Sequence, residues 1–180
     1  MKDFFAFLIE TIKIVLLAIV IVFPVRYFLF QPFFVQGISM EPSFFNGDYL
    51  IVDEITYRFR DPQRGEVLVF KYPQSPTQRY IKRIIGLPGE EVIIKNGQIN
   101  ISDSSGTWVL DESDYLEDTY TGGIVRVSLS ENEYFVLGDN RAFSSDSRRW
   151  GSLAEEFIIG KVYLRAWPFT ALAKIESPAY

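Results

Sequence analysis

The chain has 180 residues and contains neither histidine nor cysteine. These absences exclude imidazole-based catalytic triads, thiolate nucleophiles, disulfides and cysteine-ligated zinc or iron–sulfur centres. The net charge is −5, from 18 Lys and Arg against 23 Asp and Glu, and it argues against a nucleic-acid-binding protein, which usually has a basic surface. Hydrophobic residues make up 48% of the chain, enough for the core of one domain of ordinary size.

The N-terminal segment is the longest apolar stretch of the sequence. Residues 14–25 carry no charge, and apolar flanks extend the run from about Phe7 to Phe28. That length matches the roughly 20 residues that a helix needs to cross a bilayer. No A-x-A-like cleavage site follows, because the bulky residues 33–35 stand in that place. We therefore expect an uncleaved transmembrane helix in an anchor segment of residues 1–35; a cleavable signal peptide and a buried core helix are the alternatives.

Basic residues around this segment predict its orientation. Lys2 and Lys13 lie on the N-terminal side of the uncharged run 14–25, and Arg26 lies on its other side. Positive charges concentrate on the cytoplasmic side of membrane helices, so two basic residues before the run against one after it weakly favour a cytoplasmic N-terminus. The expected protein crosses the membrane once and places residues 36–180 outside the cytoplasm.

The rest of the chain has the pattern of a mostly β, antiparallel domain. Short runs rich in Val, Ile, Tyr and Phe alternate with turn signals, and Asn96-Gly97 is typical of a tight β-hairpin. Strands are expected over residues 49–52, 66–70, 79–85, 92–94, 124–127, 134–137 and 158–164. Residues 90–133 are predicted as a small β insertion, in which the acidic stretch 102–123 is interpreted as a solvated loop in preference to a cation site.

Ser39 is the first candidate nucleophile. Without histidine or cysteine, the reactive groups left are serine, threonine, lysine and the carboxylates. Ser39 follows the expected anchor closely and lies between Gly37, which would let another backbone approach, and Pro42, which would fix the following turn. An ordinary turn serine is the competing interpretation, and this spacing alone favours it.

A catalytic serine needs a base, and here only a carboxylate or a neutral lysine remains. Lys82 occurs in a strand pattern that places it on one face with Tyr80 and Ile84. Apolar neighbours depress the pKa of a lysine, normally about 10.4, because they disfavour the charged form. A surface lysine on an edge strand is the simpler interpretation of this pattern. Lys71 and Lys161 also lie in or beside expected strands and stay open as bases.

The segment of residues 138–151 is dense in Asp, Arg and Ser. Asp139, Asn140 and Asp146 are compatible with a metal loop, but the interleaved arginines disfavour a divalent cation. Arginine–carboxylate pairs that stiffen a loop beside an active site fit the composition better. We therefore expect neither a metal nor another cofactor.

Four motifs behind an N-terminal apolar segment resemble those of the bacterial type I signal peptidases, or leader peptidases, which are membrane-anchored Ser/Lys-dyad endopeptidases. They are Ser39-Met40-Glu41-Pro42, similar to S-M-x-P; residues 47–52, similar to G-D-x-[VIL]-x-V; residues 79–89, similar to R-Y-x-K-R-[VI]-x-G-x-P-G; and residues 138–148, similar to G-D-N-R-x-x-S-x-D-S-R. Each motif alone is weak, whereas all four in this order are very specific.

The resemblance implies a role for each matched residue. Ser39 would be the nucleophile, with its backbone N–H in the oxyanion hole, and Lys82 would be the general base, oriented by a hydrogen bond from Ser144. The remaining active-site support would come from Met40 and Pro42 beside the nucleophile and from the structural salt-bridge partners Asp139, Arg141, Asp146 and Arg148. Gly37 stands where some members carry a hydroxyl residue as a second oxyanion donor, so the second donor stays open.

The resemblance also implies a function. The protein would cleave signal peptides from exported preproteins after small residues of the A-x-A type, through a Ser39 acyl-enzyme at the surface of the bacterial plasma (inner) membrane. Its partners would be signal-peptide-bearing preproteins and membrane lipid. A self-cleaving repressor-type Ser/Lys protease is an alternative, but it needs a DNA-binding domain where this chain has an apolar segment. A non-catalytic anchored β module is the alternative from another class, and intact Ser39 and Lys82 argue against it.

Overall fold

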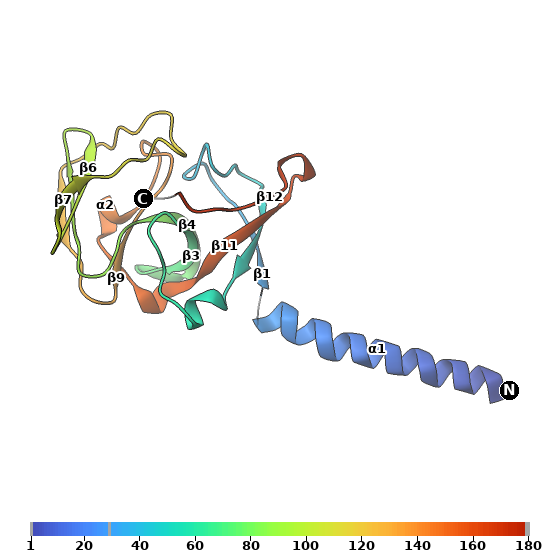
Figure 1. Cartoon of the computed structure of the whole chain (residues 1–180). Coiled ribbons are helices and arrows are strands. Elements are labelled where there is room, and N and C mark those ends of the chain that lie inside the picture. The colour runs from blue at the N-terminus through green and yellow to red at the C-terminus, as the bar shows by residue number, and fades with distance from the viewer. Residues whose placement is uncertain (1, 29, 179–180) are drawn as a thin grey trace.

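The computed structural model describes residues 2–28 and 30–178. A long helix, α1, covers Lys2–Phe28 and projects from a β domain made of two sheets (Figure 1). The shorter elements of the described chain are helix α2, Ser147–Trp150, and the 3₁₀ turns η1, Thr56–Arg58, η2, Glu155–Phe157, and η3, Phe169–Ala171. The mostly antiparallel β fold that the sequence predicts is confirmed.

The larger sheet forms the body of the domain. Its eight strands run in the order β1-β2-β11-β3-β4-β9-β10, with β12 paired to β11. Their bounds are β1 Phe30–Phe34, β2 Tyr49–Asp53, β3 Val67–Tyr72, β4 Ser75–Gly86, β9 Glu133–Leu137, β10 Leu153–Ala154, β11 Ile158–Trp167 and β12 Ala173–Lys174. All pairings in it are antiparallel. Strands β1 and β4, distant in sequence, therefore belong to one sheet.

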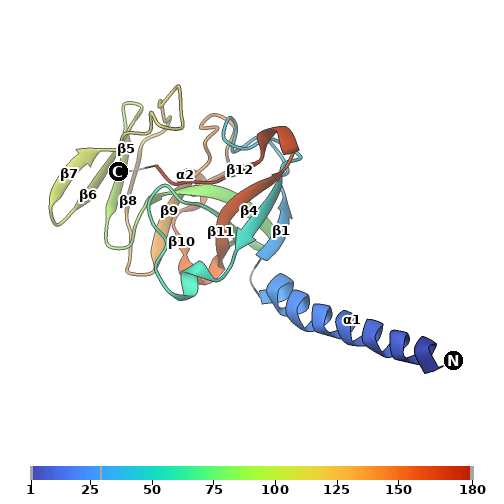
Figure 2. The same cartoon turned by 45° about the vertical axis from the view of Figure 1, so that its right-hand side comes forward.

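The second sheet has four strands in the order β7-β6-β5-β8 and lies on the side of the domain away from α1 (Figure 2). They are β5 Glu91–Lys95, β6 Gln98–Asp103, β7 Gly106–Val109 and β8 Val125–Ser128. The predicted hairpin joins β5 to β6, and Asn96 and Gly97 both have a positive φ, 54° and 81°, as a type I′ turn requires. That residues 90–133 form a separate insertion stays a prediction.

A shared core ties the two sheets together. Ile85 of β4 and Phe135 of β9 pack in one buried cluster with Val92 and Ile94 of β5 and Ile101 of β6. Because burial of apolar surface contributes about 25 cal/mol per Å², such a cluster stabilises both sheets at once. The second sheet is thus held against the strand that carries Lys82.

Helix α1 carries apolar side chains on all sides. Those of Phe4, Phe7, Ile14 and Val20 are 66–69% exposed. Within the part of the chain that the structure describes, no helix is both long and apolar enough to cross a membrane. The predicted transmembrane span is therefore not confirmed. The predicted orientation depends partly on Lys2 and Arg26, whose side chains lie outside the described residues.

Two of the strands that the sequence does not predict change the interpretations given above. Residues 30–34, placed by their aromatic composition in the anchor segment, form β1, which pairs with β2 along its whole length. Residues 106–109, within the stretch interpreted as a solvated loop, form β7, whose four exposed residues pair with β6. Both strands are short and lack the alternation of buried and polar residues that identifies a strand in a sequence.

Candidate active site

The loop between β1 and β2, residues 35–48, carries Ser39; it is called the Ser39 loop below. The Val35 N–H donates to the Asp48 carbonyl at 2.9 Å and joins the two ends of the loop. Met40, next to Ser39, is 1% exposed and packs in the hydrophobic core. A closed base and a buried neighbour together fix the position of Ser39 at the surface of the domain.

Gly37 and Pro42 shape this loop on either side of Ser39. Gly37 has a φ of +90°, which favours glycine, and a Cβ there would meet nothing within 4 Å. The expectation that Gly37 permits a close backbone approach is therefore wrong, because the position needs a backbone conformation and has space to spare. Its N–H donates to the Asn46 side-chain oxygen at 2.9 Å. Pro42 lies in the turn that follows Ser39, after a cis peptide bond.

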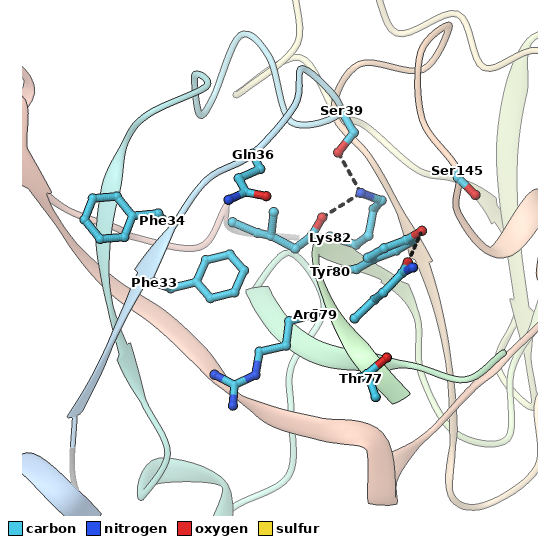
Figure 3. Close-up of a pocket in the computed structure, with 11 residues that line it drawn as sticks. Phe33, Phe34, Gln36, Ser39, Thr77, Arg79, Tyr80, Lys82 and Ser145 are labelled. Atoms are coloured by element: carbon cyan, nitrogen blue, oxygen red, sulfur yellow. Dashed lines mark hydrogen bonds between the residues drawn. The ribbon is translucent and has the colours of Figure 1, made fainter. Parts of the chain in front are cut away.

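Ser39 and Lys82 lie within hydrogen-bond distance of each other. The Lys82 Nζ is 2.7 Å from the Ser39 Oγ (Figure 3), a separation that allows direct proton transfer. The Nζ also donates to the Ile81 carbonyl at 2.8 Å. The two residues are 43 positions apart in the sequence, and pairing within the larger sheet brings them together.

Burial changes the protonation equilibrium of Lys82. The residue is 3% exposed. Removal from water lowers the pKa of Lys82 from 10.5 to about 8, although the carboxylates of Asp146 and Asp139 oppose the shift. The Tyr80 ring, with its centroid 5.5 Å from the Nζ, covers one side of the amine. At such a pKa roughly a tenth of the lysine is neutral at pH 7, and that neutral form can act as a base.

The structure distinguishes Lys82 from the other candidate lysines. The Lys161 Nζ is 3.1 Å from the Glu66 Oε1, an ion pair that favours the charged form. Lys71 is exposed, and neither of these two lysines lines the cleft beside Ser39. The interpretation of Lys82 as a surface lysine is wrong, because this side chain is buried.

The segment after β9 contacts the backbone of the Ser39 loop. The Asn140 N–H donates to the Ser39 carbonyl, and its side-chain amide donates to the Ile38 carbonyl, both at 3.1 Å. Gly138 lies at the point of contact, where a Cβ would clash with the Ser39 carbonyl oxygen and the Ser144 hydroxyl. Glycine is thus required at residue 138. The sequence gives no sign of this requirement beyond the place of that glycine in the motif.

Ser144 lies beside this contact and is buried. Its Oγ has no hydrogen-bond partner among the described residues. The predicted hydrogen bond to Lys82 is therefore absent from the structure, in which the lysine instead contacts Ser39 and the Ile81 carbonyl. A buried hydroxyl without a partner lies at the edge of the site.

Arginine–carboxylate pairs surround the site, as the composition of residues 138–151 predicts. The pairs are Arg83–Asp139, Arg141–Glu112 and Arg148–Asp146. The first is bidentate, with the Nε 2.9 Å and the Nη2 2.6 Å from the two Asp139 oxygens. Arg83 and Glu112 lie outside that segment and come from β4 and from the loop after β7, so their part in the network could not be read from the motif. In the described part of the chain no cluster of acidic side chains suits a metal ion.

A cleft of about 600 Å³ opens beside Ser39 and Lys82. One wall comes from Phe33 and Phe34 of β1, and the other comes from residues 77–82 of β4 (Figure 3). Strand β4 pairs with β9 only from Arg83 onward. Among the described residues, the edge of β4 along the cleft therefore has no strand partner from residue 75 to residue 82, and its backbone can accept an extended peptide.

Comparisons with known proteins agree with the resemblance of the motifs. Residues 8–167 match the family described as "Signal peptidase, peptidase S26". The probable signal peptidase I-2 of Synechocystis sp. is 36% identical over 163 residues, which cover 87% of this chain and 72% of that protein. Signal peptidase I P of Bacillus subtilis subsp. natto is 34% identical over 167 residues, 89% and 90% of the two chains. A solved structure of a signal peptidase I from Enterococcus faecalis V583 matches with 28% identity and a TM-score of 0.47, covering 57% of this chain and 97% of that one.

Proposed function

The chain belongs to the signal peptidases of peptidase family S26, and we propose that it removes N-terminal signal peptides from exported preproteins by means of a Ser39–Lys82 catalytic pair. The observation that carries the proposal is the 2.7 Å separation between the Ser39 Oγ and the Nζ of a buried lysine. In a chain without histidine, this pair supplies both a nucleophile and a base.

The proposed reaction is acyl transfer to serine. Neutral Lys82 removes the proton from the Ser39 Oγ, which attacks the carbonyl carbon of the scissile bond. The protonated lysine then gives its proton to the leaving amine, and the released mature protein leaves an acyl-enzyme on Ser39. Lys82, neutral again, activates a water molecule that hydrolyses this ester.

The developing oxyanion needs hydrogen-bond donors. The Ser39 N–H is one candidate, since it makes no hydrogen bond within the described residues. Gly37 has no side chain to add a second. The Gly138 contact and the ion pairs of Asp139, Arg141, Asp146 and Arg148 serve in this proposal to hold the reacting groups in place. Ser144 lies beside them, without a hydrogen-bond partner among the described residues. Met40 and Pro42 fix the backbone that follows the nucleophile.

The cleft supports an extended substrate. A signal peptide that adds to the free edge of β4 places alternate side chains toward the same wall, which suits the two small residues of an A-x-A site. Phe33, Ile81 and Tyr80 form apolar parts of the cleft.

The proposal extends to the membrane. The exposed apolar side chains of α1 are unfavourable in water, and lipid is the partner that would cover them if this helix is the anchor. The catalytic domain, which begins with β1 in the structure, would then act outside the cytoplasm of a bacterial cell, at the plasma (inner) membrane surface where exported preproteins emerge.

Cleavage of a purified signal-peptide-bearing preprotein in detergent tests the function. The wild type should release the mature protein with a new N-terminus after a small residue. Ser39→Ala and Lys82→Ala should each reduce kcat by at least about a thousandfold, because each removes a reacting group. Lys161→Ala is the matched control and should keep cleavage within a few-fold of the wild type.

Two results would contradict the assignment. Wild-type rates in either Ser39→Ala or Lys82→Ala exclude the pair as the catalytic groups. An absence of cleavage by the wild type, for preproteins with several different signal peptides, excludes the proposed activity itself. Circular dichroism of each variant checks that lost activity does not come from unfolding.

A further inference from the structure

In the described part of the chain, two charged side chains line the cleft, those of Lys82 and Arg79. Arg79 lies on β4 three residues before Lys82, about 10 Å away along an extended strand. The side chain is exposed, and Figure 3 shows its guanidinium at the end of the cleft remote from Ser39, beyond Phe33. The far end of the cleft is therefore cationic.

Arg79 also reaches across this end of the cleft toward β1. Its Nη1 lies 3.5 Å from the Gln31 Oε1. Gln31 is three residues beyond the end of α1, so the two side chains border the cleft on the side from which the helix arrives. A substrate whose N-terminal segment comes from the same side passes these two side chains before it reaches Ser39.

The positive charge of Arg79 is not neutralised by an ion pair within the described residues. Burial raises the pKa of Glu54, while the charges of Arg79 and Arg58 act to lower it, and Glu54 makes no ion pair with Arg79. Arg79 thus presents its charge to whatever occupies this end of the cleft.

We propose that Arg79, together with Gln31, selects among signal peptides by charge about four to six residues before the scissile bond, favouring acidic over basic side chains. The position follows from the strand. In an extended substrate, successive residues pair with the β4 residues from Lys82 back to Arg79. The long arginine side chain then reaches substrate residues somewhat farther from the scissile bond. This inference rests on the proposed function, since it places the signal-peptide side of the substrate in the cleft.

The test uses three preproteins that differ only in carrying Glu, Gln or Lys at one position in this range. We expect the full-length wild type to cleave the Glu substrate with a kcat/KM about two- to fivefold above that of the Lys substrate, as suits an exposed charge pair. Arg79→Glu should reverse the order, and Arg79→Gln should bring the ratio close to one. Lys95→Glu, which makes the same charge change at the far hairpin of the second sheet, should keep the wild-type ratio.

The ratio is measured within each variant, so a general loss of activity cancels, and Arg79→Gln serves if Arg79→Glu does not fold. Nonionic detergent keeps anionic lipid headgroups out of the reaction. A wild-type ratio of one, or a wild-type ratio retained in the Arg79 variants, overturns the selection by charge. If none of the three substrates is cleaved, the result instead contradicts the proposed function.

Discussion

In the proposed mechanism Lys82 must be neutral to take a proton from Ser39, and its burial determines the pH at which this happens. Because removal from water lowers its pKa to about 8, the neutral fraction grows about tenfold per pH unit below that value and levels off above it. We therefore predict that kcat/KM rises with unit slope from pH 6 toward 8 and is nearly constant above about pH 9. A rate profile between pH 6 and 10, in a chain with no histidine, measures this directly.

A second titratable group could give the pH–rate profile the same shape. The α-amino group titrates near pH 8 as well, so the same measurement on N-terminally acetylated protein is the control. A profile that is flat across this range, or that bends near the ordinary lysine value of 10.5, would contradict the lowered pKa of Lys82.

The pairing of Ser39 with Lys82 could be predicted from the sequence better than their surroundings, and their role as reacting residues stays a proposal. Ser39 and Lys82 could be named because each lies in a short motif. The partner of Asp139 could not, since Arg83 lies 56 positions away and only strand pairing brings the two together. The sequence likewise could not show that Ser144 makes no hydrogen bond with Lys82. This depends on the direction in which the Lys82 N–H groups point, which a sequence motif does not give.

At the scale of elements, β11 braces the Ser39 loop through Arg165. The Arg165 guanidinium donates to the Ser43 carbonyl, and its Nε forms an ion pair with the Asp48 Oδ2 at 3.1 Å. It also lies 5.0 Å from the centroid of the Phe44 ring. All three contacts are within the Ser39 loop, so a strand remote in sequence holds the element that carries the proposed nucleophile.

We predict that Arg165→Leu lowers kcat by about ten- to hundredfold with little change in KM, because it loosens the Ser39 loop and leaves the walls of the cleft in place. Arg165→Lys should restore part of the rate by keeping the charge. Arg149→Leu, an exposed arginine on α2, is the control. A rise in KM at unchanged kcat would show that Arg165 acts on substrate binding instead, and thermal unfolding of the variants measures any loss of stability.

The elements themselves could be predicted unevenly from the sequence. Strands with alternating or strongly apolar patterns, such as β9, lie where the sequence places them, whereas β4 covers the expected residues 79–85 but begins four residues earlier, at Ser75. Strand β1 does not, because its run of Phe-Gln-Pro-Phe-Phe continues the apolar segment before it, and its pairing with residues 49–53 identifies it as a strand only in the fold.

Helix α1 and the β domain have separable tasks in the proposed function. We predict that Leu16→Lys combined with Val20→Lys releases the protein from membranes, because a charged side chain in the hydrocarbon costs about 2.5–3.5 kcal/mol. Cleavage of a soluble peptide substrate should stay near the wild-type rate. Flotation with lipid vesicles measures the first effect, and Leu16→Ala with Val20→Ala is the matched control. Wild-type protein that does not float, or a double-lysine variant that still does, would contradict the role of α1 as an anchor.

The unpaired edge of β4 has a consequence for solubility. A strand with free N–H and C=O groups is a template on which a second copy of the chain can pair and aggregate. Pro76 and Arg79 occur on this stretch, and both residue types discourage such pairing, proline by lacking a donor and arginine by repulsion between like charges. Replacing them to widen substrate choice would therefore weaken the protection of the free protein against self-association.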